Sequence, residues 1–234
     1  MYRVVSLLGL VVFLLSCSSV ESVKFEKEYR SPERFEKSIK EFEAQDSKKS
    51  PPVGAVVVTG SSSVRMWHPR IKKDLAGLTV IPRGFGGSNM NDLLHFSDRM
   101  ILKYKPRAVV IYEGDNDTAQ GIHPLQIKTK FLSLAAKLKK QNKNVRIYLI
   151  TVKPSIKRIT IWDKALATNK IFKELSENDD NIYYIDTASA LLDGGKPKKD
   201  IFIHDNLHLN KKGYDLWSEA VKKALLPVES KYEK

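Results

Sequence analysis

The sequence contains a cluster of serines and, far from it along the chain, a closely spaced aspartate and histidine. The serines are residues 61–63, and the pair is Asp205 and His208. A serine hydroxyl becomes a useful nucleophile when a base, most often an imidazole, takes its proton. A carboxylate beside that imidazole fixes its tautomer and stabilises the imidazolium that forms. These residue types therefore predict acyl transfer through a serine, as in ester hydrolysis.

Ester hydrolysis also needs hydrogen-bond donors for the negative charge that develops on the carbonyl oxygen. A substrate can approach backbone N–H groups closely in glycine-rich turns, and the sequence offers such turns at Ser62 and at Gly87. The side-chain amide of Asn116 is a third candidate donor. Each segment also has an ordinary structural interpretation: a positive φ at Gly86-Gly87, or Asx capping in residues 114–117.

Short apolar runs rich in β-branched residues alternate with segments of helical periodicity. The runs are typical of buried strands and lie at residues 55–59, 79–82, 108–112, 145–152 and 182–185. The helical segments are residues 89–102, 124–141, 161–176 and 211–226, the last with Asn210 as its cap. This alternation predicts an α/β fold, a three-layer α/β/α sandwich around a parallel sheet of about five strands.

The polar segments follow the predicted strands at their carboxyl ends, where open parallel sheets bind ligands. Residues 60–63, 83–89 and 113–117 each follow a strand, and residues 204–208 precede the last helix. Four weak signals in order, each at a strand end of one sheet or beside it, favour a single active site over four unrelated turns.

These segments resemble, in order, the motif blocks of the SGNH hydrolases, also called GDSL-like esterases and lipases. Residues 59–67, Thr-Gly-Ser-Ser-Ser-Val-Arg-Met-Trp, are similar to the branch in which Gly-Asp-Ser becomes Gly-Ser-Ser. The resemblance implies a flavodoxin-like fold and a nucleophile at Ser62. It implies His208 as base, oriented by Asp205, and an oxyanion hole formed by Ser62, Gly87 and Asn116. It implies no metal and no cofactor.

The resemblance covers most of residues 53–226 and includes residues 152–155 with Arg158 and Trp162, a segment common in the same branch. Ser61 replaces the aspartate of the namesake motif, a change that the branch itself shows. The nucleophile elbow of α/β-hydrolases is excluded because Val64 stands where Gly-x-Ser-x-Gly requires its second glycine. The sequence leaves open whether Trp67, Trp162, Arg65 and Arg158 line the site or serve structure. His204 is interpreted as a loop residue.

Two other functions fit parts of the sequence. A metal-dependent hydrolase would use Asp115, Asp117, His204, Asp205 and His208 as candidate ligands, but it leaves the Ser62 turn, Gly87 and Asn116 unexplained. A non-catalytic, lipid-anchored binding protein on the same fold would be expected to lack Ser62 or His208, and both are present.

The N-terminus predicts export and lipidation. Arg3 precedes an apolar run at residues 4–15, which is too short to span a bilayer but suits a signal peptide. Ser16 and Cys17 follow, resembling the bacterial lipoprotein signal in which the cysteine is acylated, for example with palmitate. Cys17 is the only cysteine, so no intramolecular disulfide is possible. An ordinary cleaved signal peptide and a buried apolar helix remain as alternatives.

The predicted organisation is a signal peptide at residues 1–16, a tether with a short amphipathic helix at 17–50, and the hydrolase domain at 51–234. The protein would then sit in the bacterial cell envelope, held to a membrane by its lipid anchor and facing the periplasm or the exterior. The net charge of +13 raises the question of nucleic-acid binding, but the lysines are scattered and match no such motif. We therefore expect a lipid, carbohydrate or small-molecule ester as substrate and no nucleic-acid partner.

Overall fold

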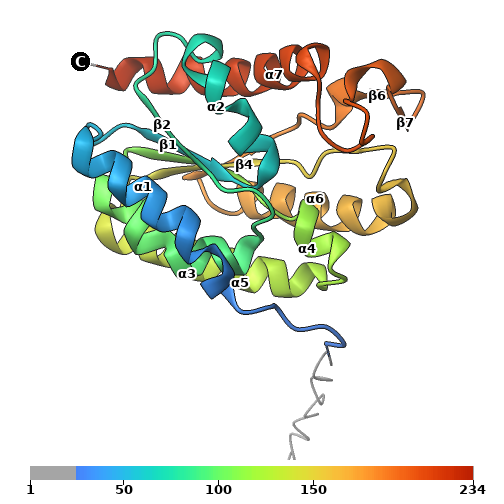
Figure 1. The fold of residues 1–234 in the computed structure, drawn as a ribbon, viewed down its shortest axis with the longest axis horizontal. Helices are drawn as coiled ribbons and strands as arrows, with labels where there is room; N and C mark the ends of the chain where they lie inside the picture. The colour runs from blue at the N-terminus through green and yellow to red at the C-terminus, as the bar shows by residue number, and fades with distance from the viewer. Residues whose placement is uncertain (1–24, 234) are drawn as a thin grey trace, which may run out of the picture.

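A parallel sheet of five strands forms the centre of the computed structural model, which describes residues 25–233 (Figure 1). The strand order is β2-β1-β3-β4-β5, the flavodoxin-like order of a doubly wound sheet. Every residue of β1, β3 and β4 is buried, as expected for strands covered on both faces. The strands are β1 Val56–Gly60, β2 Val80–Gly84, β3 Ala108–Tyr112, β4 Arg146–Ile150 and β5 Ile182–Ile185.

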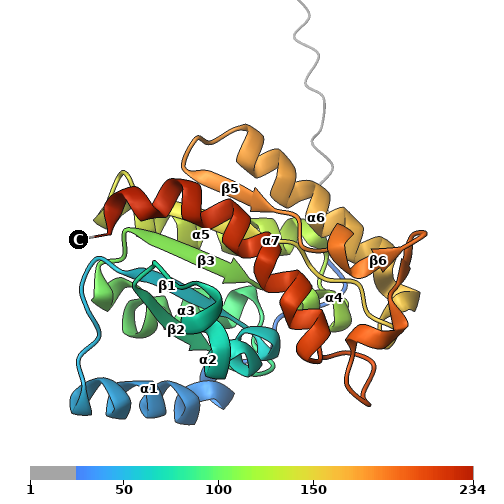
Figure 2. The same cartoon turned by 90° about the horizontal axis from the view of Figure 1, so that it is seen from above.

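Helices cover both faces of the sheet and bury a separate apolar cluster on each. One face carries α1 (Glu36–Lys48), α3 (Met90–Met100), α5 (Pro124–Gln141) and α6 (Trp162–Glu177), whose apolar side chains meet those of alternate strand residues. The other face carries α2 (Ser62–Asp74) and α7 (Lys211–Glu229), seen crossing the sheet in Figure 2. The predicted three-layer α/β/α architecture is therefore confirmed.

The strand register brings the ends of β2, β1 and β3 to one edge of the sheet. Gly60 at the end of β1 pairs with Gly84 at the end of β2 and with Tyr112 at the end of β3. The segments that follow these strands must therefore leave the sheet side by side. This register places the serine cluster and the glycine-rich turns next to one another, although they are separated in sequence.

Most predicted elements agree with the structure within a few residues, and α5 has its predicted bounds. Asn210 caps α7 as expected, its side chain accepting a hydrogen bond from the Gly213 N–H. Two helices were not predicted: α2, which contains Pro69, and the short α4 (Asp115–Ala119). A small antiparallel pair, β6 (Leu192–Asp193) and β7 (Lys196–Pro197), also lies outside the predicted strands.

The N-terminal amphipathic helix is present and packs on the main domain. It begins as a 3₁₀ turn at Pro32–Phe35 and continues as α1, which buries Ile39 and Phe42 against the sheet. The predicted signal peptide and Cys17 lie outside the described residues. Within residues 25–233, no helix is both long enough and apolar enough to span a bilayer.

Candidate active site

Ser62 is the first residue of α2 and lies at the carboxyl edge of the sheet. The chain turns sharply between β1 and α2 at Gly60, whose φ is +142°. A Cβ atom there would lie 2.2 Å from the Tyr112 carbonyl oxygen, so only glycine fits. Ser62 is half-buried, and its Oγ lies 2.8 Å from Nε2 of His208.

Asp205 and His208 share one loop between a 3₁₀ turn (Lys199–Ile201) and α7. The Asp205 Oδ1 atom accepts hydrogen bonds of 2.9 Å from the N–H groups of Leu207 and His208, which closes the loop on itself. Its Oδ2 atom lies 2.5 Å from Nδ1 of His208. Because a carboxylate accepts the proton on Nδ1, Nε2 is left free to take the proton of Ser62.

Hydrogen bonds keep Asp205 ionised. Burial alone would raise the pKa of its carboxyl group, but the bonds from the His208 ring and from the two backbone N–H groups outweigh burial. They hold the pKa of Asp205 well below its ordinary value. A negative charge is therefore in place beside the His208 ring at neutral pH.

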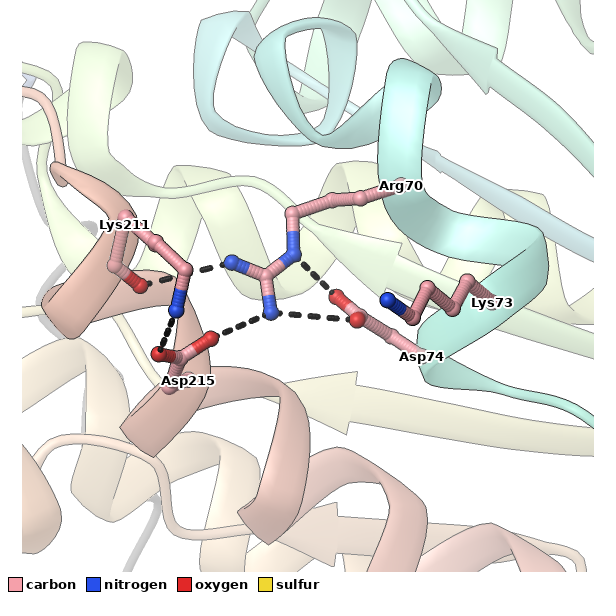
Figure 3. A pocket seen from close by; sticks show the side chains of 5 residues that line it. All are labelled: Arg70, Lys73, Asp74, Lys211 and Asp215. Carbon is pink, nitrogen blue, oxygen red and sulfur yellow. Dashed lines mark hydrogen bonds and ion pairs between the residues drawn. The ribbon is translucent and has the colours of Figure 1, made fainter.

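A cluster of charged side chains ties the helix that begins at Ser62 to the helix that follows His208. Arg70 on α2 bonds Asp74 on its own helix, Asp215 on α7 and the Lys211 carbonyl oxygen (Figure 3). Together with Lys73 these residues line a surface pocket of about 450 Å³. The pocket contains none of the predicted catalytic residues, and the ion pairs in it fasten α2 to α7.

The other two predicted oxyanion donors lie in the segments that follow β2 and β3. Gly87 follows β2 with a φ of +92° and is exposed, and Asn116 lies in the first turn of α4 after β3. The backbone N–H groups of Ser62 and Gly87 have no hydrogen-bond acceptor among residues 25–233. Such unpaired N–H groups can bind a substrate oxygen.

Two hydrogen bonds set the orientation of the Asn116 amide. Its Nδ2 atom donates to the Ser88 carbonyl oxygen at 2.9 Å, and its Oδ1 atom accepts from the Arg158 guanidinium at 2.9 Å. The amide therefore spans from the loop after β2 to the segment after β4. One Nδ2 hydrogen remains for a substrate oxygen, because an amide nitrogen carries two.

The segment after β4 supplies two cations that support the Asn116 helix. Lys153 is buried and donates to Asp115 Oδ2 at 3.1 Å, while Arg158 donates to Asp115 Oδ1 at 2.5 Å. Burial would raise the pKa of Asp115, but these two cations lower it to about 2. The sequence singled out this segment without assigning it a role, and the structure shows it holding the residue next to Asn116.

Trp67, Trp162 and His204, which the sequence also singled out, take no part in the hydrogen bonds that join Ser62, His208 and Asp205. Trp67 is fully buried between α2 and α7, where its ring meets Trp217 edge-on at 4.9 Å and its Nε1 donates to Asp74. It is therefore a core residue. Trp162 is half-buried beside Arg158 in a small pocket, and His204 is exposed, as interpreted from the sequence.

Arg65 is exposed and extends over the loop after β2. A Cβ atom on Gly86 would lie 2.6 Å from Nε of Arg65, so the glycine makes room for the arginine side chain. Neither a carboxylate nor a carbonyl oxygen within the described part of the chain bonds its guanidinium.

The candidate metal ligands do not converge. Among residues 25–233, no group of three or more His, Cys, Asp or Glu side chains is arranged to hold a metal ion. Asp115 is instead paired with Lys153 and Arg158, and Asp205 is bonded to His208.

Solved structures with similar folds come from several bacteria and a fungus. A proposed platelet activating factor from Streptococcus pneumonia matches with a TM-score of 0.72 and 18% identity, over 82% of this chain and 93% of that one. A GDSL-like lipase from Bacteroides thetaiotaomicron gives 0.65 and 20%, over 81% and 97%. A carbohydrate esterase family 3 protein from Talaromyces cellulolyticus gives 0.64 and 17%, over 78% and 100%. At these identities the likeness shows the fold.

The sequence itself matches one family model. No curated protein matches the chain. The model of the GDSL-like Lipase/Acylhydrolase family matches residues 52–216, more than half of the chain. The chain therefore belongs to the GDSL-like lipase/acylhydrolase family of hydrolases, which act on ester bonds.

Proposed function

We propose that the protein is a serine esterase that hydrolyses carboxylic esters through an acyl-enzyme intermediate. One observation carries the proposal: the hydrogen-bonded line from Ser62 Oγ through the His208 ring to the Asp205 carboxylate. Each member of this line has the partner that its chemical role requires.

In the first half of the reaction, Ser62 Oγ attacks the ester carbonyl carbon as Nε2 of His208 takes the hydroxyl proton. Asp205 stabilises the imidazolium that results. The tetrahedral intermediate collapses by breaking the bond between carbon and the alcohol oxygen. His208 returns the proton to that oxygen, the alcohol leaves, and the acyl group stays on Ser62.

In the second half, a water molecule replaces the alcohol. His208 removes a proton from the water as it attacks the acyl carbon. The bond to Ser62 Oγ then breaks as His208 returns the proton to that oxygen, and the carboxylic acid leaves. The negative charge that appears twice on the carbonyl oxygen is bound by the backbone N–H groups of Ser62 and Gly87 and by the Asn116 amide. This route uses no metal or organic cofactor.

The proposed substrates are acyl or acetyl esters of lipid, sugar or small-molecule alcohols. Two proteins of similar fold are described as a platelet activating factor and a carbohydrate esterase, which makes acetyl esters of both kinds the first to test. Comparing hydrolysis of acetylated xylose, an acetylated phospholipid and p-nitrophenyl esters of increasing chain length would rank these classes.

We also propose that the mature protein is a lipoprotein acylated on Cys17 in the bacterial cell envelope. The support is the sequence: the apolar run at residues 4–15 followed by Ser16 and Cys17. Growth of expressing cells with an alkyne-labelled fatty acid should label the wild-type chain and leave Cys17→Ser unlabelled. Equal labelling of both chains, or labelling of neither, would contradict the anchor.

The acyl-enzyme is the most direct test of the proposed chemistry. The full chain is mixed with p-nitrophenyl acetate and quenched in acid within milliseconds, and its peptides are analysed by mass spectrometry. The proposal predicts a peptide heavier by one acetyl group, with the modification on Ser62, and an initial burst of p-nitrophenol. An acetyl group on another residue, or steady hydrolysis with no modified peptide, would contradict it.

A further inference from the structure

One buried carboxylate joins the two loops that carry the proposed oxyanion donors. Asp117 Oδ1 accepts a hydrogen bond of 3.1 Å from the N–H of Met90, which opens α3 after the loop that contains Gly87. Asp117 Oδ2 accepts one of 2.9 Å from the N–H of Gly114, the N-cap of the helix that contains Asn116. The spacing of the two loops therefore depends on this side chain.

A third donor reaches the same carboxylate from outside the family-matched region. The Tyr29 hydroxyl donates to Asp117 Oδ1 at 2.8 Å, from a segment that lies more than twenty residues before the match begins at residue 52. Asp117 is completely buried. A buried carboxylate is stable only with enough donors, so the loss of one bond is costly.

The buried carboxyl groups around Asp117 make the Tyr29 hydroxyl hard to replace as a donor. Asp92 and Glu113 are also fully buried near Asp117, and one oxygen of each, Asp92 Oδ1 and Glu113 Oε2, has no partner among residues 25–233. Arg34, from the same N-terminal segment as Tyr29, donates to Asp92 Oδ2 at 2.5 Å. The buried cluster of Asp92, Glu113 and Asp117 therefore already lacks hydrogen-bond donors. Two of the donors that it has, Tyr29 and Arg34, belong to the N-terminal segment.

The N-terminal segment also contacts the oxyanion loop directly. The Phe35 ring lies 3.8 Å from the place where a Cβ atom on Gly87 would sit, and it packs edge-on against Phe85 at 5.2 Å. At the other end of the segment, the Lys27 carbonyl oxygen accepts a hydrogen bond of 3.0 Å from Gln126. Residues 27–35 are thus fastened at both ends and lie along the two loops.

We propose that Tyr29 is a positioning residue for the oxyanion hole, acting through Asp117 on the loops that carry Gly87 and Asn116. Residues 27–35, which precede the family-matched region, then help to position the active site and also connect it to the N-terminus. The inference rests on the proposed function, because it assigns Tyr29 to a hole that acts on the Ser62 acyl-transfer reaction.

A double-mutant cycle in the full chain tests this role. Tyr29→Phe, Asn116→Ala and the double variant are compared by kcat and KM for p-nitrophenyl acetate. Tyr183→Phe serves as the control, because Tyr183 stacks on Tyr148 at the far side of the sheet and its hydroxyl bonds no atom of the described residues. Thermal unfolding of each variant separates loss of fold from loss of rate.

We expect Tyr29→Phe to lower kcat about tenfold with KM changed less than about twofold, since small displacements of catalytic groups are costly. In the Asn116→Ala background the same change should cost clearly less than tenfold, because one of the two donors that it positions is already absent. Tyr183→Phe should match the wild type.

Two results would overturn the role of Tyr29: a wild-type kcat in Tyr29→Phe, or an equal tenfold loss with and without Asn116. Should Tyr29→Phe lower the melting temperature by more than the control does, the cycle is measured at a temperature at which all the variants are fully folded. Failure of the proposed function looks different, because hydrolysis would then persist in Ser62→Ala and in Asn116→Ala. The two failures are therefore distinguishable.

Discussion

The Arg158 guanidinium donates a hydrogen bond of 2.9 Å to Oδ1 of Asn116. An arginine side chain can only donate, so this contact determines which end of the amide is oxygen and which is nitrogen. The nitrogen end consequently faces the Ser88 carbonyl oxygen, to which it donates one of its two hydrogens. Arg158 thereby orients the second Nδ2 hydrogen of Asn116 toward the place where a substrate oxyanion would form.

Arg158→Gln should lower kcat about tenfold with little change in KM, because the Asn116 amide can then rotate away from its productive orientation. The matched control is Arg99→Gln, which removes an arginine paired with Glu36 and Glu43 on the α1–α3 contact. Steady-state hydrolysis of p-nitrophenyl acetate measures both. A raised KM at unchanged kcat would instead mean that Arg158 binds substrate.

Asn116→Ala should lower kcat by about 10²–10³, the usual cost of losing one oxyanion-hole donor. Its fold should survive, because Asn116 is only partly buried and lies near the start of a short helix. Asn144→Ala, a change on an exposed turn far from Ser62, is the control. Unchanged turnover in Asn116→Ala would remove the amide from the site.

Asp205→Ala should lower kcat by roughly 10⁴, because His208 then loses both the group that fixes its tautomer and the charge that stabilises its protonated form. His204→Ala is a close control, since His204 neighbours Asp205 in sequence, is exposed, and bonds no side chain of the described residues. If His204→Ala were inactive and Asp205→Ala active, the assignment of the base loop would be wrong.

The buried acidic cluster should make stability depend on pH. Burial raises the pKa of Asp92 from its ordinary value of 3.8 to about 7, although Arg34 and the Asn89 N–H oppose the shift. Between these values the folded protein holds a proton that the unfolded chain has released. The free energy of unfolding therefore falls as pH rises from about 4 to 7.

Asp92→Asn should flatten this fall, because the neutral amide does not titrate. Urea unfolding at several pH values measures the slope, and Asp98→Asn, on the exposed face of α3, should leave the wild-type slope unchanged. An identical slope in Asp92→Asn and the wild type would show that Asp92 stays ionised in the folded protein.

The sequence was sufficient to predict the sheet, and it named the candidate residues for the proposed chemistry. Buried parallel strands are typically continuous runs of apolar, mostly β-branched residues, so β1 and β3 could be located within one residue. The rule that ligands bind where parallel strands end indicated the segments that contain Ser62, Gly87 and Asn116, and the resemblance to the SGNH hydrolases selected these residues within them.

What the sequence could not give were features set by tertiary packing. The α2 helix was missed because Pro69 and several basic residues interrupt its apolar pattern, yet Trp67 and Ile71 bury its inner face. The contact between Tyr29 and Asp117 joins residues 88 positions apart, and no local pattern indicates it. The same is true of Arg158, whose partners Asp115 and Asn116 lie in the helix α4, more than 40 residues earlier in the chain.

The most direct test compares the wild-type full chain with Ser62→Ala and Ser63→Ala, with and without EDTA. Ser63 is the matched control, because it is the next residue along α2 and its hydroxyl bonds no atom of the described residues. We predict that ester hydrolysis and labelling by a fluorophosphonate probe survive EDTA, persist in Ser63→Ala and vanish in Ser62→Ala. Hydrolysis that remains in Ser62→Ala and is abolished by EDTA would contradict the serine mechanism.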